Sequence, residues 1–584
     1  MADETTLQQS LDPQETEFEF SSRQYTWVPD QNNGSYATGS IVFDLASLSN
    51  SGRFVSYENS YITIPLVLDV NLGTATTATV ENAFAASLKS GYHQLINSVS
   101  VEITNNSVVN LCNLSNVKIN YDLLSTCSKE DEQNFLPSIN FAKDTAESII
   151  YRKDATAYGY GECNNVITSQ PFNPALGWGK SMFSQNQGRL QRMVNTSFDP
   201  STTLNTAAAN YTSTSAAQTS IKNYVTQGAT DIVYYVMATI PLKIVHDIFK
   251  KLPLTKNAYL RVLVNTNANC SCTVTTNAAG ALIVSSTSST QNGVLPFMLS
   301  PINPVGYSTI IGTTPTPSNV SATVPVGSGF VVAATAATTI TATMGIGKVG
   351  TFSHSITQSR IYACTYDMSP IYEEKYFQMV PTKKILYNDM LQFYSTGVQP
   401  GGTVNQILTN GISRPRALLG VPMLSAQTNG TADIRTNTFA AGTAVTGTST
   451  FSTMSSPFSS SPATCCPLFT CSNFNILVSG QALYAANYQY KFEHFLQEIR
   501  GSNSVNGGVS LAMSSGLLSQ TDYENGYGYM YVDLSRKTGP ASDDISRSIQ
   551  VQLTNTSNCY VDIVWFVIYE REITISTSTG SLVI

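Results

Sequence analysis

The stretch "DIVYYVMATIPLKIVHDIFKKLPLTKNAYLRVLVNTN" (residues 231–267) decides the fold class, because the spacing of its apolar residues changes twice. Residues 231–240 and 259–267 are rich in β-branched and aromatic side chains, which is typical of strands. Residues 242–252 between them carry an apolar stripe at helical spacing. The stripe consists of Leu242, Val245, Ile248, Phe249 and Leu252. The stretch therefore predicts a strand, a helix and a second strand in close succession.

The same order of elements returns about 250 residues later. Residues 474–484 ("FNILVSGQALY") and 527–536 ("YGYMYVDLSR") have strand composition, and the segment between them contains "KFEHFLQEI". The apolar stripe of this second helix consists of Phe492, Phe495, Leu496 and Ile499. His494 and Glu498 lie four residues apart and could touch on one helix face. We interpret the helix as a packing element, with His494 and Glu498 directed away toward solvent or a neighbouring subunit.

Each half of the chain also ends on a strand rich in aromatic and β-branched residues, at residues 359–368 and 562–572. Two similar β-domains in tandem are therefore expected, joined near Ser369 to Val380. Alternating apolar residues support further strands. Examples are Leu95, Val99, Val101 and Ile103 in the first half and Ile545, Ile549, Val551 and Leu553 in the second.

Long tracts of Ser, Thr, Asn and Gly separate these strands, and in an all-β protein we expect such tracts to be loops. The tracts are residues 197–228, 265–357 and 425–464. The predicted organisation has three parts. They are an acidic flexible tail (1–22), a first domain with long insertions (23–370), and a second domain with the C-terminal tail (371–584).

Charge is sparse in this sequence, since only 12% of its residues are charged and the net charge is −7. No cluster of Lys and Arg is present, so the chain is not expected to bind nucleic acid directly. The first residues, "MADETTLQQS", lack the basic and apolar regions of a secretory signal, and no run is long and apolar enough to span a membrane. We expect a protein made inside the cell, with neutral polar surfaces suited to large subunit contacts.

The sequence offers no convincing metal, cofactor or catalytic site. The cysteines Cys465, Cys466 and Cys471 form one cluster without the second ligand pair that zinc requires, and we expect the ten cysteines to be free thiols. "GIGKVG" (345–350) matches G-x-G-x-x-G, but no helix pattern follows it, so we interpret it as a turn between strands. The four histidines are scattered: His93, His246, His354 and His494. We therefore expect no enzyme. A glycoside hydrolase would need a pair of carboxylates, and charged residues gather at no strand-end motif.

Four passages give the chain a resemblance to a known family. The first two are "ATIPLKIVHDIFKKLPLTKNAYLRVLV" (238–264) and residues 474–536. The others are the join "SRIYACTYDMSPIYEEKYFQMVPTKKILYNDMLQFY" (359–394) and the end "VWFVIYEREITISTSTG" (564–580). Together they resemble the double jelly-roll major capsid proteins of double-stranded DNA viruses. In its length and its lack of a basic arm, the chain is most similar to the virophage and polinton-like branch of this family. That branch is related to the capsid proteins of large nucleocytoplasmic DNA viruses.

The resemblance implies an all-β fold of two tandem eight-stranded jelly-rolls, each with a short helix between its sixth and seventh strands. It also implies a major capsid protein of the virion that forms pseudo-hexameric homotrimers, which build an icosahedral shell around double-stranded DNA. Expected partners are further copies of the chain, a vertex (penton) protein, and minor or cement proteins. The acidic tail would be either a solvated tail or a segment on the inner side of the shell. The residues expected to matter for packing are Phe249, Phe495, Leu496 and Trp565.

A protein of a different class remains open as an alternative: a β-rich viral spike or fibre, or a carbohydrate-binding adhesin. Its polar loops would have the same composition. It would be distinguished by exposed aromatic platforms for sugars, clusters of calcium ligands or a repetitive shaft, and the sequence shows no clear case of these.

Overall fold

The structure is a computed structural model that describes most strands of the chain and the helices between them. The described residues are 20–71, 84–143, 225–227, 231–276, 282–288, 293–301, 338–424, 469–505, 515–535, 545–557 and 560–582. The expected tail lies mostly outside this range, although the first strand already begins at Phe20. Cys465 and Cys466 also lie outside it.

Roll one consists of two antiparallel sheets, whose strand orders are β1-β16-β3-β8 and β2-β9-β5-β6. Its strands are β1 (Phe20–Pro29), β2 (Ser40–Asp44), β3 (Phe54–Asn71), β5 (Ile96–Ile103), β6 (Asn106–Val109), β8 (Asp231–Pro241), β9 (Leu260–Thr266) and β16 (Arg360–Met368). The first sheet therefore joins the first, eighth, third and sixth strands, and the second sheet joins the second, seventh, fourth and fifth. This order defines a jelly-roll.

Roll two repeats this order in the sheets β17-β24-β19-β22 and β18-β23-β20-β21. Its strands are β17 (Thr382–Val398), β18 (Thr403–Ile412), β19 (Pro415–Leu424), β20 (Cys471–Val478), β21 (Gln481–Ala482), β22 (Met530–Asp533), β23 (Arg547–Asn555) and β24 (Val561–Ser576). The prediction of an all-β fold with two tandem jelly-rolls is confirmed by the strand order alone.

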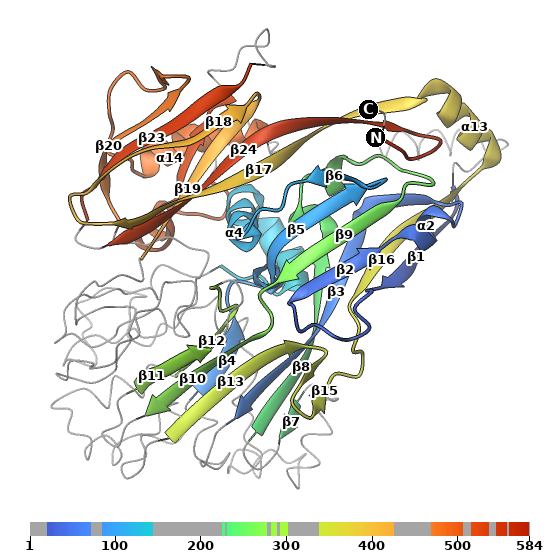
Figure 1. Ribbon diagram of the computed structural model, residues 1–584, viewed down its shortest axis with the longest axis horizontal. Coiled ribbons are helices and arrows are strands. Elements are labelled where there is room, and N and C mark those ends of the chain that lie inside the picture. The colour runs from blue at the N-terminus through green and yellow to red at the C-terminus, as the bar shows by residue number, and fades with distance from the viewer. Residues whose placement is uncertain are drawn as a thin grey trace.

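Additional strands extend roll one at the end that lies lowest in Figure 1. They are β4 (Phe84–Leu88), β7 (Val225–Gln227), β10 (Cys270–Thr276), β11 (Leu282–Ser288), β12 (Phe297–Pro301), β13 (Thr338–Ile346), β14 (Lys348–Val349) and β15 (Phe352–Ser353). The expectation that residues 265–357 form a loop is therefore wrong for much of this range. Segments such as "CSCTVTT" pair as strands because β-branched Thr suits a pleated sheet as well as Val does.

The motif "GIGKVG" forms the turns that join β13, β14 and β15, as predicted, and no helix follows it. Gly347 has a φ of +70°. A Cβ atom there would lie 2.6 Å from the carbonyl oxygen of Thr357, so only glycine fits this turn.

The helices are short and occupy the connections between strands. They are α2 (Ala46–Ser49), α4 (Ser115–Thr126), α5 (Lys129–Asn134), α9 (Leu242–Val245), α10 (Ile248–Lys251), α13 (Pro370–Met379), α14 (Phe492–Val505) and α15 (Gln520–Asp522). Single turns are η1 (Tyr92–Leu95), η2 (Leu136–Ile139) and the π-turn η5 (Tyr523–Tyr527). Helix α13 connects the two rolls (Figure 1).

The helix predicted over residues 242–252 is broken in the structure. His246 adopts an extended conformation (φ −154°, ψ 145°) and separates α9 from α10. Its ring Nδ1 accepts a hydrogen bond from the Ile248 N–H, and this bond satisfies one of the free donors at the start of α10.

The expected equivalence of the two helical passages is also wrong. Helices α9 and α10 lie between the sixth and seventh strands of roll one, as the resemblance implies. Helix α14 instead lies between the fifth and sixth strands of roll two, β21 and β22. Its counterpart by position in roll one is α4, which lies between β6 and β8 and was not predicted. Composition identified the elements but not their place in the strand order.

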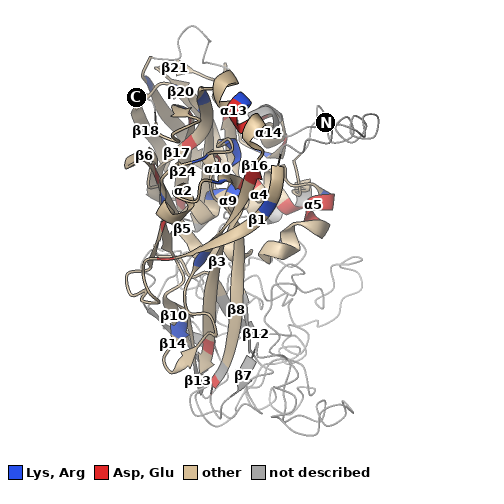
Figure 2. Cartoon of the chain, turned by 90° about the vertical axis from the view of Figure 1, so that its right-hand side faces the viewer, with Lys and Arg blue, Asp and Glu red and all other residues tan. Residues whose placement is uncertain are grey.

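Two apolar cores correspond to the two rolls. The predicted alternation is confirmed in β5 and β23, where Val99, Val101, Ile549, Val551 and Leu553 are buried. Ile545 was expected on the same face, but it precedes β23 and is 62% exposed. In the view of Figure 2, positions of acidic and basic residues are scattered over the described ribbon.

Candidate functional site

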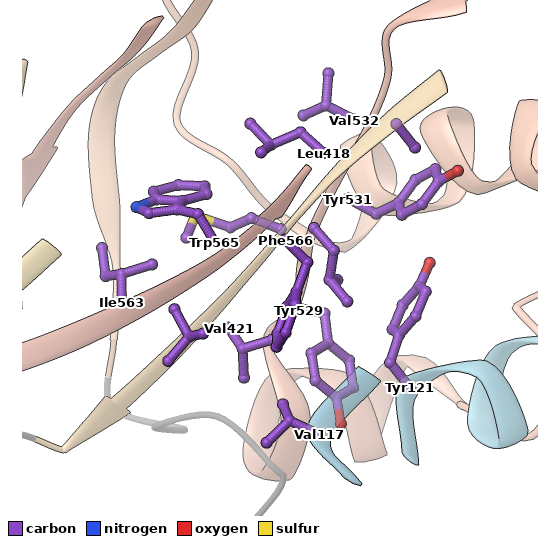
Figure 3. Packing of buried hydrophobic residues seen from close by; sticks show 14 of the residues in the cluster. Val117, Tyr121, Leu418, Val421, Tyr529, Tyr531, Val532, Ile563, Trp565 and Phe566 are labelled. Atoms are coloured by element: carbon purple, nitrogen blue, oxygen red, sulfur yellow. The ribbon is translucent and has the colours of Figure 1, made fainter. Parts of the chain in front are cut away.

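One contact between distant parts of the described chain joins the two rolls, and helix α4 of roll one contributes to it. Val117, Tyr121 and Leu124 follow a helical spacing of four and three residues, and all three are buried. They belong to the same apolar cluster as the strands of roll two. The Tyr121 ring lies edge-on to Tyr529, at 5.2 Å between centroids, and parallel to Tyr531, at 5.7 Å (Figure 3). A helix of roll one thus completes the core of roll two.

Strand register identifies which face of roll two this helix covers. Tyr531 pairs with Leu419, and Leu419 pairs with Phe566, so the three side chains lie on one face of the sheet, beside α4. The adjacent residues Trp565 and Leu418 lie on the opposite face, toward the second sheet of the roll. The outer face of the β17-β24-β19-β22 sheet is therefore covered from within the same chain.

Buried polar groups connect the rolls as well. The His93 Nε2 lies 3.1 Å from the Asn120 Oδ1, and the Asn120 amide donates to the Tyr529 hydroxyl at 3.3 Å. The Asn116 amide donates to the Gln94 Oε1 at 2.8 Å. Buried amides need such partners, so these bonds fix the orientation of α4 between the rolls.

Strands β17 and β24 cross the boundary between the two cores. Ile385, Tyr387 and Ile575 are buried in the core of roll one. Met390 and Phe566, further along the same two strands, are buried in the core of roll two. The antiparallel pairing is continuous from Thr382↔Ser576 to Ser395↔Ile563, so one two-stranded ribbon contributes to both cores (Figure 1).

A buried ionic cluster lies where this ribbon passes from one core to the other. The Asp389 side chain is fully buried, and its Oδ2 lies 2.9 Å from the Arg571 Nη1. Its Oδ1 lies 3.6 Å from the His246 Nε2 and accepts the Met390 N–H at 2.8 Å. Because the His246 Nδ1 accepts the Ile248 N–H, a neutral His246 carries its proton on the Nε2 that faces Asp389.

The electrostatics of this cluster favour the charged carboxylate. Burial alone would raise the pKa of Asp389, but the interactions with His246, Arg571 and the Met390 N–H outweigh it and lower that pKa below its usual value. Removing one member of a buried ionic cluster is costly because its partner loses an oppositely charged neighbour, so the cluster favours the arrangement of the two rolls seen here. A cavity of about 60 Å³ adjoins it, with Lys118, Lys243 and Lys250 in its lining.

A further contact lies at the far end of α4. The Lys143 ammonium is 2.9 Å from Asp522 and donates to the Leu517 carbonyl at 2.7 Å. The Leu517 N–H donates to the Leu124 carbonyl at 2.8 Å. Gly516 has a φ of +66°, and a Cβ atom there would lie 2.4 Å from the Leu124 oxygen, so glycine permits this close approach.

The structure places the predicted packing residues in two separate cores. Phe249 in α10 is fully buried, 6.4 Å from the Tyr57 ring. Phe495 in α14 is fully buried against Tyr523, and Leu496 is half-buried beside the same core.

Trp565 in β24 is also fully buried, and its Nε1–H donates to the Ser395 Oγ at 2.9 Å. Gly420 makes room for the indole, since a Cβ atom there would lie 2.4 Å from it.

The expected outward direction of Glu498 and His494 is wrong. Glu498 is buried, and its Oε2 accepts the Asp533 N–H at 2.9 Å. His494 is half-buried, with its ring 4.7 Å from the Tyr488 ring. The buried face of the helix is wider than its apolar stripe, because a carboxylate beside the stripe can also be buried when a backbone N–H is available to it.

The sequence reasoning also missed α4 and the Asp389 cluster. In α4, Asn116 and Asn120 interrupt the apolar pattern, although Val117, Tyr121 and Leu124 gave a usable signal. Asp389, Arg571 and His246 are far apart in sequence, so no local pattern could bring them together.

The described residues offer little chemistry for catalysis. They contain no group of three or more His, Cys, Asp and Glu side chains that could hold a metal ion. A cavity of about 280 Å³ beside α14 has four aromatic residues in its lining and Glu524 as its one described carboxylate. A glycosidase would need two carboxylates. Cys471, once grouped with Cys465 and Cys466, is a buried free thiol, and burial raises its pKa to about 12. None of the described helices has the length and apolar character needed to cross a membrane.

Comparison with solved structures finds similar chains in several viruses. A chain of the Sputnik virophage is 11% identical with a TM-score of 0.46, and the match covers 97% of this chain and 88% of that one. The mavirus major capsid protein is 11% identical with a TM-score of 0.39, covering 98% and 93%. The Faustovirus major capsid protein is 8% identical with a TM-score of 0.40, covering 95% and 91%. No protein-family model matches this sequence, and no curated protein sequence matches it.

Proposed function

We propose that this chain is the major capsid protein of a double-stranded DNA virus, acting as a structural subunit and not as an enzyme. The observation that carries the proposal is the pair of complete jelly-rolls held together as one block. Helix α4, the β17–β24 ribbon and the Asp389 cluster fix the two rolls to each other. A rigid block with two similar halves is suited to tiling a closed shell with copies of one chain.

The mechanism is assembly. Two rolls in one chain supply two of six similar positions around a ring, so three copies give a homotrimer of pseudo-hexagonal outline. Trimers then cover the faces of an icosahedral shell around the DNA, within the virion. The low share of charged residues, 12%, favours wide neutral contacts between copies. A vertex protein and minor or cement proteins would complete the shell.

Within this proposal the units are residues 23–370 and 371–584. The packing residues Phe249, Phe495, Leu496 and Trp565 act by keeping each roll rigid enough to assemble. The acidic residues 1–22 carry no assigned role, and removing residues 2–20 tests whether they contribute to particle yield.

Electron microscopy of the purified protein, together with its mass in solution, tests the proposal. The expected result is a particle of three chains with hexagonal outline, or spontaneous shells. A protein that remains a single chain under all assembly conditions would contradict it.

A carbohydrate-binding adhesin is the second candidate, and one observation favours it. Trp27 and Tyr25 are 50% and 47% exposed on one sheet face, as aromatic platforms for sugars are. Binding of the purified chain to an immobilised glycan array would support the adhesin, and an array without binding would remove it.

A further inference from the structure

The cavity beside the Asp389 cluster lies between the two rolls. Its lining comes from α4, α9 and α10 of roll one and from the β17–β24 ribbon. Val245 in this lining belongs to the core of roll one, whereas Met390 and Ile568 belong to the core of roll two. A molecule bound there would therefore contact both halves of the block. We call this space the inter-roll cavity.

The size of the inter-roll cavity limits what can enter it. Its volume is about 60 Å³, which is several times the roughly 10–15 Å³ that a single water needs. Pockets for small organic molecules usually measure about 300–1,000 Å³, so a nucleotide base or a sugar ring does not fit inside. The space matches a few waters or one compact ion.

Three lysines line the inter-roll cavity, and only one of them is neutralised. The Lys118 ammonium lies 2.6 Å from the Asp122 Oδ1. Lys243 and Lys250 form no ion pair within the described part of the chain. The Lys243 ammonium lies 5.2 Å from the centre of the Phe135 ring instead. Two positive charges therefore border the cavity without a carboxylate to balance them.

The other carboxylates near the cavity have partners of their own. Asp389 is held by the ionic cluster described above, and the Asp247 Oδ2 accepts the Asn388 N–H at 3.0 Å. Asp131 lies outside the lining and senses the charge of the α9 lysine, but its carboxylate accepts the Ser128 N–H at 2.8 Å. A metal cation would therefore meet two lysines and only carboxylates that already have partners.

The lining offers hydrogen-bond donors from three elements. Lys243 lies in α9, Lys250 in α10 and Asn388 in β17. The side-chain amide of Asn388 makes no hydrogen bond within the described part of the chain, so it adds a neutral donor to the two ammonium groups. An anion with several oxygen atoms can accept from donors on different sides at once. Hydrogen bonds between an ammonium group and such an anion are among the strong ones in proteins, and lysine is a common phosphate ligand.

We propose that the inter-roll cavity is a binding site for a phosphate group, which joins α9 and α10 of roll one to the β17 strand of the shared ribbon. The phosphate neutralises Lys243 and Lys250 and accepts the Asn388 amide. It thereby reinforces the boundary that the Asp389 cluster already holds. The inference goes beyond the proposed function and does not depend on it, because the site is complete within one folded chain.

Calorimetric titration of the full chain with inorganic phosphate tests the site, with chloride used to keep the ionic strength constant. The expected result is saturable binding of one phosphate per chain. A phosphate monoester, glucose 6-phosphate, is titrated in parallel. Tighter binding of the free ion or of the monoester would identify the source of the phosphate group, and either supports the site. No saturable binding of either ligand at millimolar concentration would overturn the proposal.

Substitution of the two lysines tests the location. Lys243→Gln/Lys250→Gln removes both charges and should weaken phosphate binding about tenfold or more. Lys243→Arg/Lys250→Arg keeps the charges and should still bind. The matched control is Lys251→Gln, which changes the adjacent exposed lysine of α10, outside the lining, and should leave the affinity unchanged. If the double glutamine variant does not fold, Lys250→Gln alone replaces it, because that side chain is exposed. Unchanged binding by the glutamine variant, or an equal loss in Lys251→Gln, would overturn the proposal.

Urea unfolding tests whether the bound ion holds the folded block together. A ligand that binds only the folded chain raises its stability as the ligand concentration increases. Phosphate should therefore raise the urea midpoint of the natural chain and leave that of Lys243→Gln/Lys250→Gln nearly unchanged. An equal rise in both proteins would indicate a general salt effect and would overturn the proposal. A chain that assembles into trimers without binding phosphate would overturn this inference alone and leave the capsid proposal intact.

Discussion

Strands β16 and β24 hold the same place in the two rolls, but they are buried differently. In β16, buried Ile361 and Ala363 alternate with half-exposed Arg360 and Tyr362. In β24, the residues from Ile563 to Ile568 are all buried. The difference arises from α4, which covers the second face of β24, whereas no described helix covers the second face of β16. The position of a strand in a jelly-roll therefore does not determine whether its outward-facing side chains are polar or apolar. That depends on what covers the outside of the sheet.

The largest expected effect comes from breaking roll two at the helix that packs on its edge. Phe495→Asp removes a fully buried ring, which costs about 3–5 kcal/mol, and places a carboxylate without a partner in the core. We expect loss of soluble folded protein, measured by yield and by thermal unfolding. Gln497→Asp, at an exposed position of the same helix, should behave like the natural protein. A soluble Phe495→Asp variant of normal stability would contradict the placement of α14.

The next effect concerns the boundary between the two cores. Asp389→Ala leaves Arg571 and His246 facing each other without their carboxylate, and removing one partner of a buried ion pair costs about 3–5 kcal/mol. Urea unfolding at neutral pH should show the loss. The exposed Glu493→Ala serves as the control and should leave the urea midpoint unchanged.

The natural protein and the Asp389→Ala variant should also differ in how their stability depends on pH. The folded pKa of Asp389 lies below its unfolded value of about 4. Its stabilisation is therefore fully present above about pH 4 and is lost as the pH falls through the folded pKa. The natural protein should lose more stability between pH 5 and pH 2 than Asp389→Ala does. Equal slopes for the two proteins in that range would show that this carboxylate does not link the rolls.

A smaller effect is expected when the outer sheet face of roll two, which α4 covers, is compared with the half-exposed outer sheet face of roll one. Tyr121→Leu removes two aromatic contacts in the buried face of roll two, each worth about 0.5–1.5 kcal/mol, so a total loss of about 1–3 kcal/mol is expected. Tyr61→Leu also removes two ring contacts, with Tyr362 and Tyr25, but on a half-exposed face of roll one where the side chains stay partly hydrated, so it should cost less than Tyr121→Leu. Both are measured by urea unfolding of the unassembled chain. A larger loss for Tyr61→Leu would reverse the comparison.

The last prediction is that the two rolls unfold at the same urea concentration. Burial raises the pKa of Cys272 in roll one and of Cys471 in roll two to about 12, so both are neutral and unreactive when folded. Pulse labelling with a thiol reagent in increasing urea, read by peptide mass mapping, reports when each roll opens. Because α4 belongs to the core of roll two, both cysteines should become labelled at the same urea concentration. Separate midpoints would indicate two independent units.

Much of the fold could be predicted from the sequence, because its signals are local. Alternation identified β5 and β23, composition identified β8, β16 and β24, and the three- and four-residue spacing of Phe492, Phe495 and Ile499 identified α14. Strand order was predicted only through a resemblance, and the helix equivalence drawn from it was wrong. The sequence predicted one strand over residues 474–484, but in the structure a turn at Ser479 and Gly480 divides them into β20 and β21.

The contact between the rolls could not be predicted, because it depends on residues that are distant in sequence. Tyr121 meets Tyr531 although the two are 410 residues apart in sequence, and Asp389 meets Arg571 across the two paired strands of the ribbon, 182 residues apart. Even the burial of Glu498 depended on a backbone donor of Asp533, which no periodicity of α14 reveals.

The shared ribbon has a consequence for how the protein is made. Domains usually fold in order as the ribosome releases them. Roll one, however, lacks Ile575 from its core until β24 has been synthesised, and Leu582 then packs against the same core. The first domain to be synthesised is therefore the last to be finished. Chains that stop before β24 therefore lack buried residues of both cores.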